Sequence, residues 1–122
     1  MNEELIKYDL FHKGLNHYKN RSFLNEHEDW ETLWSDYYLP DRDFIQGLIQ
    51  LSVSFIHLNN GNLIGAKSLL KKCQKKFNNF NGDCRGINVD ILKNDLQQLS
   101  IEYDLLETHT SFNWEFVPEL RT

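Results

Sequence analysis

One segment, residues 41–59, constrains the fold of this chain more than any other. Its apolar side chains recur every three or four residues, as on one side of an α-helix, and further isoleucines add a second side. These side chains are Phe44, Leu48, Leu51, Phe55 and Leu58 on the first side and Ile45, Ile49 and Ile56 on the second. A helix that is apolar on two sides is normally surrounded by other helices. The sequence therefore predicts an all-α fold with this helix at its centre.

The remaining sequence favours helices as well, because no alternating run of strand length occurs in it. Helical periodicity is found at residues 3–18, 22–36, 63–77 and 89–107. With 122 residues, the chain is expected to form one domain, a compact array of about five helices.

The connections between these helices carry recognisable turn residues. Gly61 is placed to end the helix at 41–59 with a positive φ, and Asn62 to cap the helix that follows. Residues 78–86 are expected to form a loop. Residues 109–122 have no helical period, and their aromatic side chains predict an irregular tail that docks on the body or on a partner.

Composition and charge exclude several classes of function. The net charge of −5 argues against nucleic-acid binding, and the lysines at 67–76 are interpreted as a solvated helix face. No apolar run is long enough to span a membrane, and the N-terminus lacks the pattern of a signal peptide. We therefore expect a cytoplasmic protein. Cys73 and Cys84 are not spaced as a CxxC pair and are expected to be free thiols.

The stretch HEDWE, within residues 22–36, is the most distinctive polar feature. Helical geometry places His27 and Glu31 one turn apart, in the same sector as Trp30 and Trp34, with Glu28 near its edge. An aromatic face is normally buried, and a buried carboxylate without a partner costs several kcal/mol. We therefore expect His27 and Glu31 to be largely buried and hydrogen-bonded.

The central helix offers possible partners for this pair. A polar strip on it carries Gln46, Gln50, Ser54 and His57. Together the two helices predict a buried polar cluster of six residues beside an aromatic wall formed by Trp30 and Trp34. The six are His27, Glu28, Glu31, Gln46, Gln50 and His57.

Three roles are open for this cluster. The first is a structural hydrogen-bonded group. The second is a divalent metal site of a hydrolase-like enzyme, with His27, Glu31 and His57 as ligands, Glu28 as general base and Gln50 as an orienting group. The third is a small-ligand cavity that needs no metal. The pattern departs from the metalloprotease motif H-E-x-x-H, because a glutamate occupies the position of the second histidine.

Three motifs in this order also resemble a known family. They are HExxE followed by Trp34, then QGLIQ at residues 46–50, then His57, Gly61, Asn62, Gly65 and Ala66 as H-x-x-x-GN-x-x-GA. Over about residues 8–106 the chain resembles the bacterial, archaeal and plastid family called domain of unknown function 309.

The resemblance implies a small helical fold and no established reaction, so it assigns no catalytic residue and no cofactor. Together with the absence of nucleophile and nucleotide motifs, this favours a non-enzymatic module that binds a protein partner or a second copy of itself.

Overall fold

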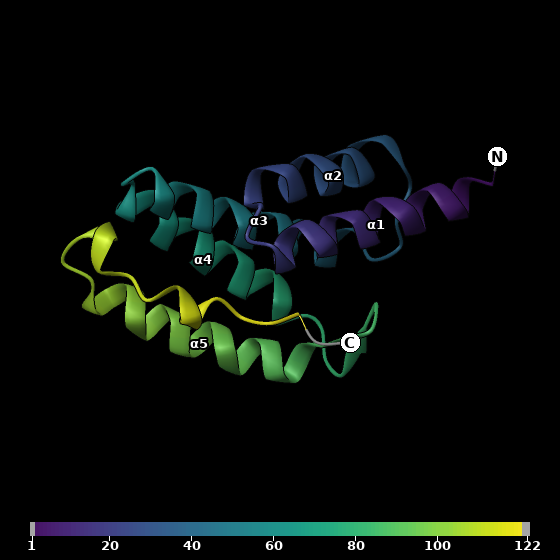
Figure 1. Ribbon diagram of the computed structural model, residues 1–122. Helices are drawn as coiled ribbons and strands as arrows, with labels where there is room; N and C mark the ends of the chain where they lie inside the picture. The colour runs from purple at the N-terminus through teal and green to yellow at the C-terminus, as the bar shows by residue number, and fades with distance from the viewer. Residues whose placement is uncertain (1, 121–122) are drawn as a thin grey trace.

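The computed structural model describes residues 2–120, which form five α-helices, one two-stranded hairpin and two short 3₁₀ turns (Figure 1). The helices are α1 (Glu3–Lys19), α2 (Phe23–Asp36), α3 (Arg42–Asn59), α4 (Leu63–Phe77) and α5 (Val89–Leu105). The hairpin pairs β1 (Asp83–Cys84) with β2 (Ile87–Asn88), and the 3₁₀ turns are η1 (His109–Ser111) and η2 (Trp114–Phe116). The predicted all-α class is confirmed.

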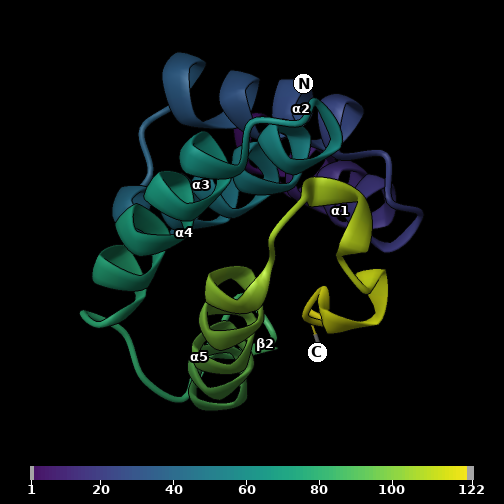
Figure 2. The same ribbon diagram turned by 90° about the vertical axis from the view of Figure 1, so that its left-hand side faces the viewer.

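Helix α3 lies at the centre of the array, as its two apolar sides predict. It packs directly against α2 and α4, while α1 packs on α2 and α5 packs on α4 (Figures 1 and 2). The apolar side chains of α3 account for a large share of the core; those fully buried are Phe44, Ile45, Leu48, Leu51, Phe55 and Leu58. Burying a side chain of this size stabilises a fold by about 1.5–3 kcal/mol.

The turn between α3 and α4 has the geometry expected from its sequence. Gly61 has a φ of 80°, and the Asn62 side chain accepts a hydrogen bond of 2.8 Å from the backbone N–H of Gly65. A Cβ atom at Gly65 would lie 2.5 Å from Asn62 Nδ2, so glycine at this position lets the cap form. The two glycines and Asn62 therefore set the sharp reversal of the chain between α3 and α4.

Replacing Gly61 with alanine is expected to lower the free energy of unfolding by about 1 kcal/mol, because alanine tolerates a positive φ poorly. Gly61→Asn is the matched control and should cost less, since asparagine adopts the left-handed conformation more readily. Urea unfolding of the three proteins measures both effects. Equal stability of the natural chain and Gly61→Ala would contradict this account of the turn.

The segment expected to be a plain loop contains a tight hairpin. Arg85 and Gly86 connect the strands, and both have positive φ, 54° and 79°, as a two-residue type I′ turn requires. Strands of two residues are too short to show an alternating pattern in the sequence. The Arg85 guanidinium binds the carboxylate of Asp41 just before α3, with Nη2 2.9 Å from Oδ1.

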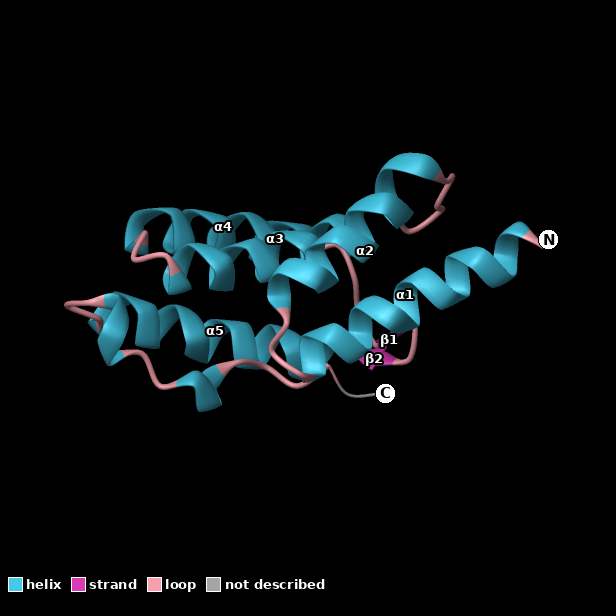
Figure 3. Cartoon of the chain, turned by 45° about the horizontal axis from the view of Figure 1, so that its top comes forward, coloured by secondary structure: helices cyan, strands magenta, loops and turns pink. Residues whose placement is uncertain are grey.

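Only the second half of α1 contributes to the core. The sequence pattern extends the apolar stripe of this helix from Leu5 through Tyr8 to Tyr18, but Leu5 and Tyr8 are exposed and burial begins at Phe11. The first half of α1 extends away from the other helices (Figure 3). The apolar stripe is therefore present on α1, but Leu5 and Tyr8 lie beyond the helices that bury the rest of it.

The C-terminal tail docks on the body of the molecule. It runs back along α5, and the Tyr18 hydroxyl in α1 donates a hydrogen bond of 2.6 Å to the carbonyl of Pro118 (Figures 1 and 2). Trp114 lies against Phe23 of α2 and Phe55 of α3, with ring centroids 6.3 and 6.1 Å apart. The tail therefore bridges α1, α2 and α3 to α5.

Two smaller expectations are also met. Among residues 2–120, no helix is long and apolar enough to cross a membrane. Cys73 and Cys84 are both free thiols. Cys73 is fully buried, and burial raises the pKa of its thiol well above the ordinary value, so it is an inert core residue.

Candidate functional site around Glu26

The buried face of α2 differs from the face expected from its aromatic residues. The side chains that α2 buries are Phe23, Glu26, Trp30 and Leu33, whereas His27 and Glu31 keep 31% and 47% of their side-chain surface exposed. Glu28 is exposed. The expected burial of His27, Glu28 and Glu31 is therefore wrong.

Compared with the expected orientation, α2 is rotated about its own axis, so that Glu26 and Leu33 face the core in place of His27 and Glu31. Trp34, expected on the buried face, lies at its edge and is half-buried, with the Arg42 guanidinium 3.8 Å from its ring centroid. The indole Nε1 of Trp34 is itself buried and has no hydrogen-bond partner among the described residues. His27 and Glu31 lie one turn apart on the flank of the helix, with 3.8 Å between Nε2 and Oε2.

The polar strip of α3 divides into residues with separate roles. Ser54 is fully buried; its hydroxyl donates to the Ala66 carbonyl at 2.7 Å and lies 3.0 Å from the Tyr103 hydroxyl. These bonds join α3, α4 and α5. His57 belongs to the α3–α4 turn, where its Nδ1 lies 3.4 Å from the Asn62 amide.

Gln46 and Gln50 are half-buried on α3, and Gln50 Oε1 has no hydrogen-bond partner among the described residues. Within residues 2–120, no hydrogen bond joins either glutamine to His27 or Glu31. The six residues of the expected cluster are thus distributed over the flank of α2, the side of α3 and the α3–α4 turn.

The arrangement of side chains also bears on the expected metal ligands. In the part of the chain that the structure describes, no three His, Cys, Asp or Glu side chains converge closely enough to hold a metal ion. His27, Glu31 and His57 are therefore not brought together as a ligand set. Glu28, the candidate general base, is exposed on α2.

The acidic residue that does enter the core is Glu26, which sequence analysis did not single out. It is 0% exposed, and its Oε1 is hydrogen-bonded to the hydroxyl of Ser52 on α3. Ser52 is also fully buried, and its hydroxyl lies 3.0 Å from the carbonyl of Leu48 one turn earlier. Glu26 Oε2 has no hydrogen-bond partner among the described residues.

These contacts fit a protonated Glu26. Burial raises the pKa of Glu26 from its ordinary value of 4.5 to about 9, against a smaller lowering by the Ser52 hydrogen bond. The Ser52 hydroxyl has one proton but two acceptors within reach, Leu48 O and Glu26 Oε1. A protonated Glu26 satisfies both contacts. Its own O–H donates to the Ser52 hydroxyl, and the Ser52 hydroxyl donates to the Leu48 carbonyl. A buried carboxylate would be an uncompensated charge.

Trp30 of α2 packs against α1. Its ring lies between Phe11 and Tyr18 of α1, and its indole N–H donates to the Phe11 carbonyl at 3.1 Å. A Cβ atom at Gly14 would lie 2.2 Å from Trp30 Nε1, so this glycine lets the indole contact the α1 backbone. The Trp30 indole and the absence of a side chain at Gly14 therefore determine how α1 packs against α2.

A strongly raised pKa is also typical of catalytic acids. Glu26 differs from them in having no exposed surface, so a substrate cannot reach it in this structure. Ser52, which lies outside the polar strip of Gln46, Gln50, Ser54 and His57, is the sequence signal that could have indicated a buried polar partner. The chemistry supported by this geometry is a neutral hydrogen bond that joins α2 to α3.

Comparison with known proteins identifies a family for part of the chain. Residues 11–69 match the family model described as Domain of unknown function (DUF309). The matched segment runs from the core half of α1 to the first half of α4, and it includes HEDWE, QGLIQ and the α3–α4 turn. No curated protein and no solved structure matches the chain. Residues 11–69 of this chain are therefore a DUF309 domain.

Proposed function

We propose that the protein is a non-enzymatic helical module that associates with a second copy of itself through the first half of α1. The observation that carries the proposal is a group of large exposed apolar side chains at one end of the molecule. Leu5, Tyr8 and Tyr38 are 58%, 60% and 77% exposed. With Leu39 and Pro40 they line a groove of about 610 Å³.

The first half of α1 has little tertiary packing, because Leu10 is its only apolar side chain packed against the core. Residues 3–10 contain no buried side chain, and a short helical stretch is marginal in water on its own. Lys7 ties this stretch to the α2–α3 connection through a bond of 2.8 Å to the Tyr38 carbonyl. Grouped apolar side chains on such a surface are typical of a protein interface.

The charges on α1 favour a second copy as the partner. A two-fold interface brings the same surface together twice, so that surface must carry both signs of charge. Glu3 and Glu4 lie at the start of α1, and the exposed Lys13 lies further along it. Two α1 helices packed antiparallel bring the acidic start of each near Lys13 of the other.

The test compares the natural chain with a Leu5→Glu/Tyr8→Glu variant by sedimentation velocity over a range of concentrations. Both side chains are exposed, so the fold should be unchanged, while the dimer dissociation constant should rise about tenfold or more. Ile64→Glu, on a strongly exposed residue at the opposite end of the molecule, is the control and should dimerise normally. A monomeric natural chain at every concentration would overturn the proposal.

A further inference from the structure

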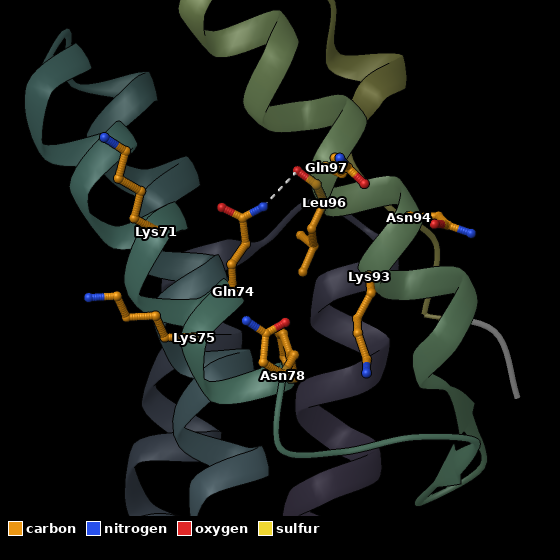
Figure 4. A pocket seen from close by; sticks show the side chains of 9 residues that line it. Lys71, Gln74, Lys75, Asn78, Lys93, Asn94, Leu96 and Gln97 are labelled. Atoms are coloured by element: carbon orange, nitrogen blue, oxygen red, sulfur yellow. Dashed lines mark hydrogen bonds between the residues drawn. The ribbon is translucent and has the colours of Figure 1, made fainter.

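A groove with a volume of about 550 Å³ runs between α4 and α5 (Figure 4). Lys71 and Lys75 stand on the α4 side of it and Lys93 on the α5 side. The described residues that line the groove include no aspartate or glutamate. The groove is thus positively charged on both sides, in a chain whose net charge is −5.

The three lysines are not neutralised within the described chain. None of them has a carboxylate within ion-pair distance there, in contrast to Lys76, which lies 3.8 Å from Asp43. Lys93 donates one hydrogen bond of 3.2 Å, to the neutral side-chain oxygen of Asn81. The ammonium groups of Lys71 and Lys75 extend outward from α4, away from α5, so the positive charge lies at the rim of the groove (Figure 4). Positive charge at the rim raises the local concentration of an anionic ligand.

Between the lysines, the groove presents amide groups over an apolar floor. Gln74 comes from α4 and Asn78 directly follows its last residue, and each amide can both donate and accept hydrogen bonds. Asn94 of α5 also borders the groove, but its side chain points away from α4 (Figure 4). The Gln74 amide points across the groove to the Leu96 carbonyl, at a long 3.5 Å, so an incoming group can displace it (Figure 4). Phe77 lies beneath and is fully buried.

We infer that this groove binds a short acidic segment of a partner protein. Carboxylates of the segment pair with the lysines on the two sides, and its backbone amides pair with the amide side chains between them. A nucleic acid fits less well, because no exposed aromatic ring lines the groove for base stacking and the chain as a whole repels a polyanion.

The groove is distinct from the surface proposed for self-association. Its lysines lie on α4 and α5, after the end of the DUF309 match at residue 69, whereas the exposed apolar residues lie on α1 and the α2–α3 connection. A dimer could form without peptide binding, and peptide binding could occur in a monomer. The two experiments therefore succeed or fail independently.

The test measures fluorescence anisotropy of a labelled peptide of repeated Glu-Glu-Leu units titrated with the full chain at moderate salt. A Lys71→Glu/Lys75→Glu/Lys93→Glu variant should bind about tenfold or more weakly, because every reversed charge lies at the groove. The matched control reverses Lys19, Lys67 and Lys72, which do not line the groove and lie outside the surface proposed for self-association. Its net charge equals that of the first variant, yet it should bind nearly as well as the natural chain, because salt screens distant charges.

A peptide of Gln-Gln-Leu units and a labelled single-stranded oligothymidylate complete the experiment. Neither should bind the natural chain measurably under the same conditions. Equal weakening in both triple variants, or no binding of the acidic peptide, would overturn the inference. Tighter binding of the oligothymidylate than of the acidic peptide would also overturn it, in favour of a nucleic acid as the occupant. Circular dichroism establishes that each variant is folded.

Discussion

Replacing Glu26 with glutamine is expected to make the protein increasingly more stable than the natural chain as the pH rises. Because the folded-state pKa of Glu26 is raised from 4.5 to about 9, the folded protein keeps a proton that the unfolded chain releases. The contribution of Glu26 to stability is full below pH 4.5 and is lost as the pH rises through about 9. Between these two pH values, the free energy of unfolding of the natural chain falls by about 1.4 kcal/mol per pH unit relative to that of the glutamine variant.

Between pH 5 and pH 8 the difference in free energy of unfolding between the two proteins should therefore change by about 4 kcal/mol. Urea unfolding at several pH values measures it. Glu26→Ala should show the same pH dependence but lie about 2–3 kcal/mol below Glu26→Gln throughout, because it leaves a cavity and removes the hydrogen bond to Ser52.

Glu28→Gln is the matched control for this series, since Glu28 is an exposed glutamate on the same helix. Its stability should follow that of the natural chain at every pH. A difference between Glu26→Gln and the natural chain that does not vary with pH would show that Glu26 is already ionised in the folded protein.

Ending the chain after Leu106 is the second change with a large expected effect. It removes the buried side chains of the tail, which are Phe112, Val117, Pro118 and Leu120. It also removes the Pro118 acceptor of the Tyr18 hydroxyl and uncovers Phe23 and Phe55. We expect a loss of at least about 4 kcal/mol, even after allowing for the entropy of ordering the tail.

A single substitution tests the tail if the shortened chain does not fold. Phe112 packs edge-on against Tyr103, with ring centroids 5.6 Å apart, so Phe112→Ala should cost about 3–5 kcal/mol. Ser111→Ala, next to it and exposed, should have little effect. A stable, cooperatively unfolding chain that lacks the tail, with the stability of the full chain, would contradict a structural role for these residues.

Much of the fold follows from local sequence rules. The two apolar sides of residues 41–59 predict a central helix, and Gly61 followed by Asn62 predicts the turn, because these signals depend only on helical geometry and backbone conformation. The two-residue strands of the hairpin are too short for an alternating pattern, so Arg85 and Gly86 gave no clear signal of their paired positive φ values.

The buried face of α2 could not be predicted in the same way. Tryptophan and histidine suit both a core and its edge, and Trp34 lies at the edge in contact with Arg42, which is on another helix. A glutamate is normally counted as exposed, so Glu26 becomes a candidate for the core only when Ser52 is known to face it. Likewise, nothing in the sequence of α1 shows that Leu5 and Tyr8 extend beyond the helices that cover Phe11.

The protonation state of Glu26 in the folded protein distinguishes most directly between a structural core carboxyl and a reactive site on the HEDWE helix. It is measured by following the carboxyl carbon of Glu26 by nuclear magnetic resonance through a pH titration, with Glu26→Gln used to assign the signal. We predict that this carboxyl stays protonated through neutral pH and titrates near 9. A titration midpoint near the ordinary value of 4.5 would show a charged, accessible carboxylate and would contradict the structural role assigned to Glu26.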